Sequence, residues 1–194
     1  MDLLYSMVPL ALGVATPIII SSLGGLFSER SGIVNIALEG IMLVGAFAGA
    51  TSSILLEGSL GALAPWVGIL IGAFFGMLFS LIHAFASIHL KADQTISGTA
   101  LNMLSTGLTV YLCQIIFDAQ RSPNFQESFS KISVPVLSDI PVIGDLFFTD
   151  VYPTFFISIV LVFITYFVVF KSKFGLHLRS CGEYRRQVHL WELM

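Results

Sequence analysis

Polar side chains that can bind a small solute recur at helical spacing near the start of an apolar stretch. Ser31, Asn35 and Glu39 follow one another at intervals of four residues. Residues four apart share one face of an α-helix, so this segment, if helical, presents an amide beside a carboxylate. A carboxylate inside an apolar run is costly unless it is paired or faces water. The spacing therefore predicts a polar or hydrated surface around Glu39.

A second polar face is predicted further along the chain, where five polar residues follow at intervals of four, three, four and three. They are Thr95, Thr99, Asn102, Thr106 and Thr109. A threonine can satisfy its hydroxyl on its own helix, so the face is either self-contained or the wall of a hydrated path. Because five positions are in register, we favour the path. We predict that Asn35 and Glu39 face the same interior as this second face.

No pattern typical of catalysis or metal binding accompanies these residues. The sequence lacks a Gly-x-x-x-x-Gly-Lys-Ser/Thr phosphate loop, a Gly-x-Ser-x-Gly turn and a His-Glu-x-x-His pair. Cys113 and Cys181 lie in different kinds of segment, and no metal-ligand partner matches the spacing of His83 and His89. The two histidines are interpreted as core or interface residues. We predict a protein that is not an enzyme and that needs no metal or cofactor of its own.

The composition is that of an integral membrane protein. Of 194 residues, 56% are hydrophobic and 11% charged, and the mean hydropathy is +0.90, whereas soluble domains carry about 25% charged residues. The net charge of −3 says nothing about nucleic acid, but no basic cluster suggests such a partner, and the composition indicates the lipid bilayer instead. We predict an all-α transmembrane bundle of about five spans. Their ranges are Leu3–Phe27, Ile36–Leu56, Trp66–Leu90, Thr95–Phe117 and Pro153–Phe170.

The distribution of lysine and arginine predicts the orientation of the spans. Lys171, Lys173, Arg179, Arg185 and Arg186 follow the fifth span, which places the C-terminus in the cytoplasm. The acidic stretch between the fourth and fifth spans is then outside, and so is the N-terminus.

Several segments have features of their own. In the first span, Pro9, Gly13 and Pro17 predict either a structural kink or a broken helix near a pathway. Stripes of small residues in the second and third spans predict close helix packing; they are Gly45, Gly49, Ser53, Gly68, Gly72, Gly76, Ser80 and Ala84. The apolar loop 120–151 predicts a short helix or re-entrant segment, and the fifth span is expected to face lipid.

Three stretches together resemble a known family: Phe27–Met42, Ala92–Asn102 and Phe174–Glu183. The first carries a group of polar, glycine and leucine residues that resembles the family's pattern, namely Glu29, Ser31, Gly32, Asn35, Leu38, Glu39 and Gly40. The chain resembles the permease subunits of bacterial ABC importers for nucleosides and simple sugars, which are related to ribose and branched-chain amino acid permeases.

The resemblance implies a multi-pass protein of the bacterial cell membrane that takes up nucleosides or sugars such as ribose. It also implies a second permease subunit, a cytoplasmic ABC ATPase that hydrolyses ATP, and an extracytoplasmic substrate-binding lipoprotein. The substrate pathway would involve Asn35, Glu39, Thr95, Thr99, Asn102 and Thr106. The loop that docks on the ATPase would contain Gly175, Gly182 and Glu183, with Arg179 among them.

The chain departs from the family pattern after Glu183. The family continues with Pro-x-Ala-Ala and further spans, whereas this chain has Tyr184 and ten more residues. We interpret residues 1–183 as the N-terminal part of a permease and 184–194 as an out-of-frame tail, so that the product is an incomplete copy that does not transport alone. A genuinely short relative is the alternative. Other functions left open are a branched-chain amino acid permease, an ion-coupled carrier and a membrane assembly factor.

Overall fold

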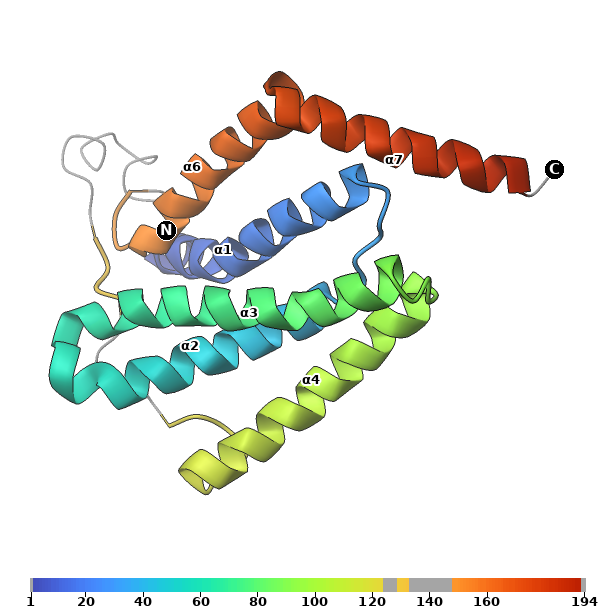
Figure 1. Ribbon diagram of the computed structural model, residues 1–194. Coiled ribbons are helices and arrows are strands. Elements are labelled where there is room, and N and C mark those ends of the chain that lie inside the picture. The colour runs from blue at the N-terminus through green and yellow to red at the C-terminus, as the bar shows by residue number, and fades with distance from the viewer. Residues whose placement is uncertain (1, 124–128, 133–147, 193–194) are drawn as a thin grey trace. The chain divides into compact units, whose positions relative to one another are not determined.

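A computed structural model describes residues 2–123, 129–132 and 148–192 (Figure 1). The chain divides into two compact units, Ile33–Ser128 in one and Met1–Gly32 with Phe129–Met194 in the other. The first unit contains α2 (Leu38–Leu60), η1 (Gly61–Leu63), α3 (Ala64–Ile88) and α4 (Gln94–Phe117). The second contains α1 (Asp2–Arg30), α6 (Pro153–Tyr166), η2 (Phe167–Lys171) and α7 (Lys173–Glu192). Apart from an isolated bridge between Ile132 and Val151, these described elements are helical, which confirms the all-α prediction.

Four continuous helical stretches among the described residues are long and apolar enough to cross a membrane. They are Met7–Arg30, Leu38–Ile88, Gln94–Phe117 and Pro153–Lys171. The second stretch has 51 residues and comprises both α2 and α3, joined through η1. Each of the five predicted spans therefore corresponds to a helix, with ends that agree within a few residues. Their orientation in the membrane stays a prediction.

The first span is one continuous helix through both of its prolines. The alternative of a broken helix is therefore wrong. The Thr16 hydroxyl donates to the carbonyl of Leu12 at 2.9 Å, so this polar side chain is satisfied on its own helix. α1 ends at Arg30, and Gly32 follows with φ of 84°, a conformation that glycine adopts without steric cost.

The segment after Gly32 is irregular until Leu38. Ser31, Asn35 and Glu39 therefore do not stack on one helical face, and that expectation is wrong. The turn at Gly32 breaks the helix that the spacing of four residues suggested.

Within the first unit, α2 and α3 form an antiparallel hairpin whose contact is lined by glycine (Figure 1). A Cβ atom on Gly72 would lie 2.6 Å from the carbonyl oxygen of Gly45, and one on Gly49 would lie 3.0 Å from that of Gly68. Such approach between backbones requires residues without side chains. The predicted packing seams on these two helices are confirmed.

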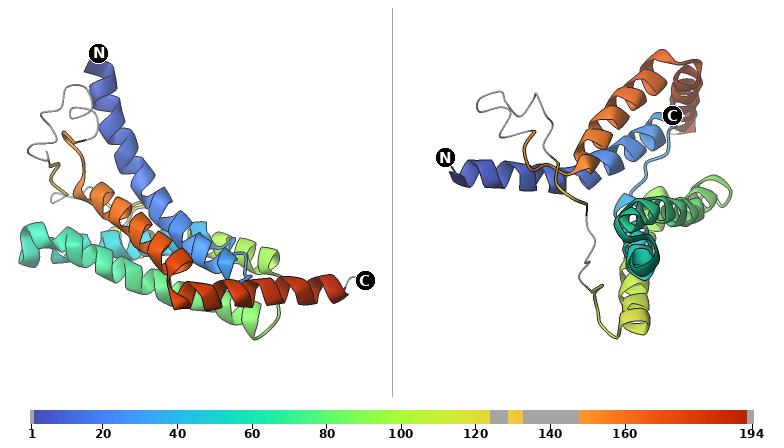
Figure 2. Two further views of the ribbon diagram at one scale, coloured as in Figure 1. Left: turned by 90° about the horizontal axis from the view of Figure 1, so that it is seen from above. Right: turned by 90° about the vertical axis from the view of Figure 1, so that its left-hand side faces the viewer.

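In the second unit, α1 packs against α6 and α7. α6 passes into η2, a single π-helical turn, and the chain then bends at Ser172 into α7, as both views of Figure 2 show. The region expected to form a docking loop is thus a helix. Most of the loop 120–151, with its expected short helix, lies outside the described residues.

Candidate functional site

The irregular segment between α1 and α2 is bonded to α4 through two amide side chains. The Val34 N–H donates to Oε1 of Gln94 at 2.9 Å. Asn102 uses both ends of its amide, because its Nδ2 donates to the Ile36 carbonyl at 2.9 Å and its Oδ1 accepts from the Gly40 N–H at 2.8 Å. Residues about 60 positions apart in sequence are thereby joined.

These bonds satisfy backbone groups that have no helical partner. Non-helical backbone at membrane depth is tolerated only where the protein itself satisfies it. Asn35 contributes locally, since its Oδ1 accepts from the Ala37 N–H at 3.1 Å. Asp93 caps the start of α4 by accepting from the N–H groups of Thr95 and Ile96 at 2.8 and 3.0 Å.

Two glycines let the segment approach α4 closely. A Cβ on Gly98 would lie 2.8 Å from Cβ of Ile36, and a Cβ on Gly40 would lie 2.7 Å from the hydroxyl of Ser105. Gly40, Gly98 and Ser105 are all buried. The N-terminal end of α2 and the first half of α4 consequently form one close-packed junction.

Glu39 lies in the first turn of α2 and is exposed. The helix begins at Leu38, so the carboxylate stands at the end of the span and not in its middle. A negative charge at this place is stabilised by the N–H groups at the helix N-terminus. Glu39 forms no ion pair with another described residue.

The threonines of α4 bond to their own helix. Thr99 donates to the carbonyl of Thr95 at 2.8 Å, Thr106 to that of Asn102 at 2.9 Å, and Thr109 to that of Ser105 at 2.8 Å. Each hydroxyl has used its hydrogen atom and keeps lone pairs with which to accept. Thr95, Thr99 and Thr106 are exposed within their unit, whereas Thr109 is buried.

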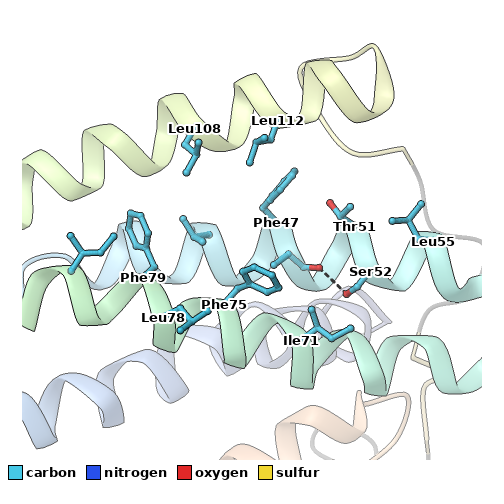
Figure 3. A pocket seen from close by; sticks show the side chains of 13 residues that line it. Phe47, Thr51, Ser52, Leu55, Ile71, Phe75, Leu78, Phe79, Leu108 and Leu112 are labelled. Atoms are coloured by element: carbon cyan, nitrogen blue, oxygen red, sulfur yellow. Dashed lines mark hydrogen bonds between the residues drawn. The ribbon is translucent and has the colours of Figure 1, made fainter.

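An apolar groove of ≈ 520 Å³ runs between α2, α3 and α4 (Figure 3). Leu108 and Leu112 of α4 lie over Phe47 of α2, and Phe75 of α3 points into the groove from below. The Thr51 hydroxyl, which also lines it, has no hydrogen-bond partner among the described residues.

On each of α2 and α4, the exposed polar residues stand on the side of that helix that is turned away from this groove. At about 100° of rotation per residue, Thr106 is roughly 160° from Leu108, and Glu39 is roughly 180° from the groove residue Ala48. The same spacing puts Thr95 and Thr99 about 140° from Leu108 and Leu112 respectively. We call these four exposed residues, Glu39 of α2 and Thr95, Thr99 and Thr106 of α4, the polar flank.

Asn35 and Asn102 adjoin the polar flank but have backbone partners of their own. Of the six predicted pathway residues, four thus form the flank and two hold the chain that supports it. Five of the six lie at one end of the α2–α4 pair, and Thr106 lies one turn of α4 beyond Asn102.

The predicted docking residues all lie on α7, where the two glycines face inward. A Cβ on Gly175 would collide with the carbonyl oxygens of Val168 and Val169 in η2, and a Cβ on Gly182 would collide with that of Arg30. Glu183 is exposed, and Arg179 donates from Nε to the Gly175 carbonyl at 3.3 Å. Gly175 and Gly182 therefore fix α7 against its own unit, while Glu183 is accessible.

The histidines of the third span have different surroundings. His83 is buried, with Nδ1 3.2 Å from the Ser97 hydroxyl, in agreement with its interpretation as a core residue. Its Nε2 and the Ser87 hydroxyl are buried without a hydrogen-bond partner among the described residues. His89 is exposed and its ring stacks on that of Phe85.

Sequence reasoning missed the roles of Gln94, Gly98 and Ser105 at the junction. Small residues on one face of an apolar helix indicate close helix packing. Gly98 and Ser105, seven residues apart, provide this signal on α4. The partner of Gln94 depends on the fold of a distant segment, and no local pattern indicates it.

Comparison with known proteins gives the family of the chain. Residues 8–190 match the family described as branched-chain amino acid transport system / permease component. The chain is 47% identical over 183 residues to the guanosine ABC transporter permease protein NupQ of Bacillus subtilis, a match that covers 94% of the chain and 57% of the relative. It is 46% identical over 169 residues to the nucleoside ABC transporter permease protein NupC of Lactococcus lactis, covering 87% and 53%.

A more distant relative is the putative glucose ABC transporter permease protein TsgC13 of Haloferax volcanii, 33% identical over 176 residues, with 87% of the chain and 49% of the relative covered. The chain spans about half the length of these relatives. No solved structure matches the chain significantly. The apolar helices and these relatives identify a multi-pass membrane protein. With a family match that covers most of its length, the chain belongs to the permease components of the branched-chain amino acid transport system family.

Proposed function

We propose that the chain is a membrane-spanning permease subunit of an ATP-driven importer that takes up nucleosides. The observation that carries this proposal is its identity of 47% and 46% to relatives named as guanosine and nucleoside permeases. The sequence has no phosphate-binding loop, so ATP hydrolysis is assigned to a separate ABC ATPase subunit.

A sugar is the second candidate substrate. The relative from Haloferax volcanii, at 33% identity, is named as a putative glucose permease. Nucleosides and sugars share hydroxyl groups, which threonine oxygens and a carboxylate can bind, so both suit a polar surface of this kind.

In this proposal the polar flank faces the solute path. Glu39 offers two acceptor oxygens, and the exposed threonines offer lone pairs that their backbone bonds leave available. Gln94 and Asn102 act as positioning residues, because their bonds fix the segment that carries Asn35 and leads to Glu39. The groove on the other side, which is almost entirely apolar, suits contact with lipid or with another apolar helix.

The proposed assembly contains a second permease subunit, two ATPase subunits and an extracytoplasmic substrate-binding lipoprotein. The cluster of lysine and arginine around η2 and α7 supports a cytoplasmic location for this end, in agreement with the positive-inside rule. We assign the exposed face of α7, with Glu183, to contact with the ATPase. The buried Gly175 and Gly182 then serve to hold α7 in place for that contact.

Uptake in the native cell tests the substrate. The gene for this chain is deleted, and the initial uptake of labelled guanosine is compared with that of labelled ribose, glucose and leucine in the same strain. The proposal predicts a loss of guanosine uptake that a gene for the full-length permease repairs, whereas residues 1–194 expressed alone, as an incomplete copy, should not repair it; unlabelled nucleosides should compete with the label. Normal guanosine uptake in the deletion strain would contradict it, and loss of sugar or leucine uptake alone would favour the other candidates.

The source of energy separates an ATP-driven importer from an ion-coupled carrier. A protonophore applied while ATP is kept constant should leave guanosine uptake largely intact, whereas depletion of ATP should abolish it. Co-purification tests the partner: an affinity-tagged chain should retain the ATPase subunit in mild detergent. Retention that is unaffected when Glu183 is replaced by Arg would place the contact elsewhere.

A further inference from the structure

The ring of Phe170 lies between two arginines that come from different helices. The guanidinium carbon of Arg30, at the end of α1, is 5.5 Å from the ring centroid, and that of Arg179, in α7, is 5.7 Å from it. Both distances are within the range of a cation–π interaction. η2, which contains Phe170, thus holds two positive charges near one another at the end of a membrane span.

Two more cations follow Phe170 within three residues of the chain. Lys171 and Lys173 flank the bend after η2, and both are exposed. Arg30, Arg179, Lys171 and Lys173 form no ion pair with a described carboxylate. Glu29 lies next to Arg30 in the sequence and Glu183 lies four residues after Arg179, and both carboxylates are exposed. Arg179 uses Nε on the Gly175 carbonyl, which leaves its terminal nitrogens available. A group of like charges near the same bend is stabilised by an anion. The planar guanidinium group of arginine can donate two parallel hydrogen bonds to the oxygens of a phosphate.

An apolar ridge that begins on α6 and continues into η2, called here the α6 ridge, leads to the same place. Its exposed side chains recur at helical spacing as Val160, Phe163, Ile164 and Phe167, and their exposed fractions are 56%, 68%, 51% and 64%. On a membrane span such a ridge contacts lipid tails. The ridge ends at Lys171, so an apolar surface and a cationic cluster adjoin along one helix, as the two parts of an amphiphile require.

We propose that Arg30, Arg179, Lys171 and Lys173 around Phe170 bind the headgroup phosphate of an anionic phospholipid, whose acyl chain lies along the α6 ridge. An anionic lipid is favoured over a zwitterionic one, because a zwitterionic headgroup brings a positive charge of its own to a cluster that is already positive. The site rests on the membrane location of the chain and not on nucleoside transport. Phe170 is its positioning residue, since its ring holds the two guanidinium groups.

Native mass spectrometry of the whole chain tests this site. The chain is reconstituted in bilayers of equal parts phosphatidylglycerol and phosphatidylcholine, extracted in mild detergent, and the lipids retained are counted. We expect one phosphatidylglycerol to be retained in preference to phosphatidylcholine. The double variant R30Q/R179Q should lower that preference about thirtyfold, at about 1 kcal/mol for each of the two cations near a lipid surface. The matched control R121Q/K131Q removes the same charge from residues outside the cluster and should leave the preference unchanged.

Two further variants keep the test decisive. R30K/R179K retains the charge but loses the fork geometry, and should give an intermediate preference. F170L retains apolar volume but removes the ring face, and should lower the preference while Tm in phosphatidylcholine alone changes little. If wild type shows no preference, if the control pair loses as much as R30Q/R179Q, or if R30Q/R179Q and R30K/R179K both retain the wild-type preference, the site does not exist as proposed.

Discussion

α2 contacts its two neighbours in its own unit in different ways. Its contact with α3 is a seam of glycines, in which the carbonyl of Gly45 faces Gly72 and that of Gly68 faces Gly49. Its contact with α4 near the start of both helices is a set of hydrogen bonds, in which Asn102 serves the backbone of Ile36 and Gly40. The first contact depends on the absence of side chains and the second on one particular side chain.

The difference follows from what each backbone lacks. α2 and α3 are regular where they meet, so their backbone bonds are internal and the seam needs only space and dispersion contact. The chain before Leu38 is irregular, and its N–H and C=O groups require partners from elsewhere. A change at the seam should therefore push the hairpin apart as a whole, whereas a change at the junction should release single backbone groups.

The largest expected effect is that of G72A at the seam. The new Cβ would lie 2.6 Å from a carbonyl oxygen, which cannot move without moving α2, so we expect a loss of about 3 kcal/mol in the free energy of unfolding. The matched variant G107A lies on α4 with no atom within 4 Å of the new Cβ, and should be stabilising by up to about 1 kcal/mol through helix propensity. Denaturant unfolding in detergent micelles measures both, and equal effects would show that the seam is not tight.

The next effect is that of N102A, which leaves the Gly40 N–H and the Ile36 C=O without their partner. One buried group without a partner costs about 1–3 kcal/mol, and hydrogen bonds in membrane proteins tend toward the lower end, so we expect a loss of about 2 kcal/mol. T99A removes only a bond within one helix and serves as the control, with a loss below about 0.5 kcal/mol.

Hydrogen exchange separates this variant from the first. The Gly40 amide should exchange much faster in N102A, while the amides of α3 keep the rates of the wild type. Slow exchange at Gly40 in N102A would mean that another group replaces the asparagine. In G72A we expect the opposite pattern: the amides of α3 should exchange faster, while the Gly40 amide keeps the rate of the wild type.

The sequence predicted those features whose cause lies within a single segment of the chain. The spans follow from runs of apolar residues, and the seam follows from glycines four apart, because each signal is complete within its own helix. Asn102 was recognised as part of a polar face for the same reason. Its partners were not, since Ile36 and Gly40 are more than 60 residues away and only the folded chain brings them near.

The expected helix through Ser31, Asn35 and Glu39 fails for a local reason. The spacing of four residues is helical, but Gly32 adopts a left-handed conformation that ends α1. A glycine shortly after an arginine in the last turn is a known termination signal, and it outweighs the periodicity. Asn35, three residues further into the irregular segment, then accepts from the Ala37 N–H instead of facing Glu39 along a helix.

A smaller effect is expected at the cap of α4. D93A removes the acceptor of the Thr95 and Ile96 N–H groups and should cost about 1 kcal/mol. D93N keeps a capping oxygen and should cost little. Since Gln94 follows directly and holds Val34, the Val34 amide should exchange faster in D93A than in D93N; equal rates would show that cap and junction are independent.

The smallest effect on stability, and the sharpest on function, is expected from E39Q on the polar flank. Glu39 is exposed, so the free energy of unfolding should stay within about 0.5 kcal/mol of the wild type. If the flank faces the solute path, the initial rate of guanosine uptake in cells that carry the corresponding variant of a full-length relative should fall about tenfold, as expected when a solute hydroxyl loses a charged acceptor. The control D118N makes the same chemical change at the other end of α4, in a left-handed position that asparagine tolerates, and should alter neither quantity. Unchanged uptake in E39Q, at unchanged protein level, would leave Glu39 with only its role in the first turn of α2, and would assign the junction as a whole to support and not to the path.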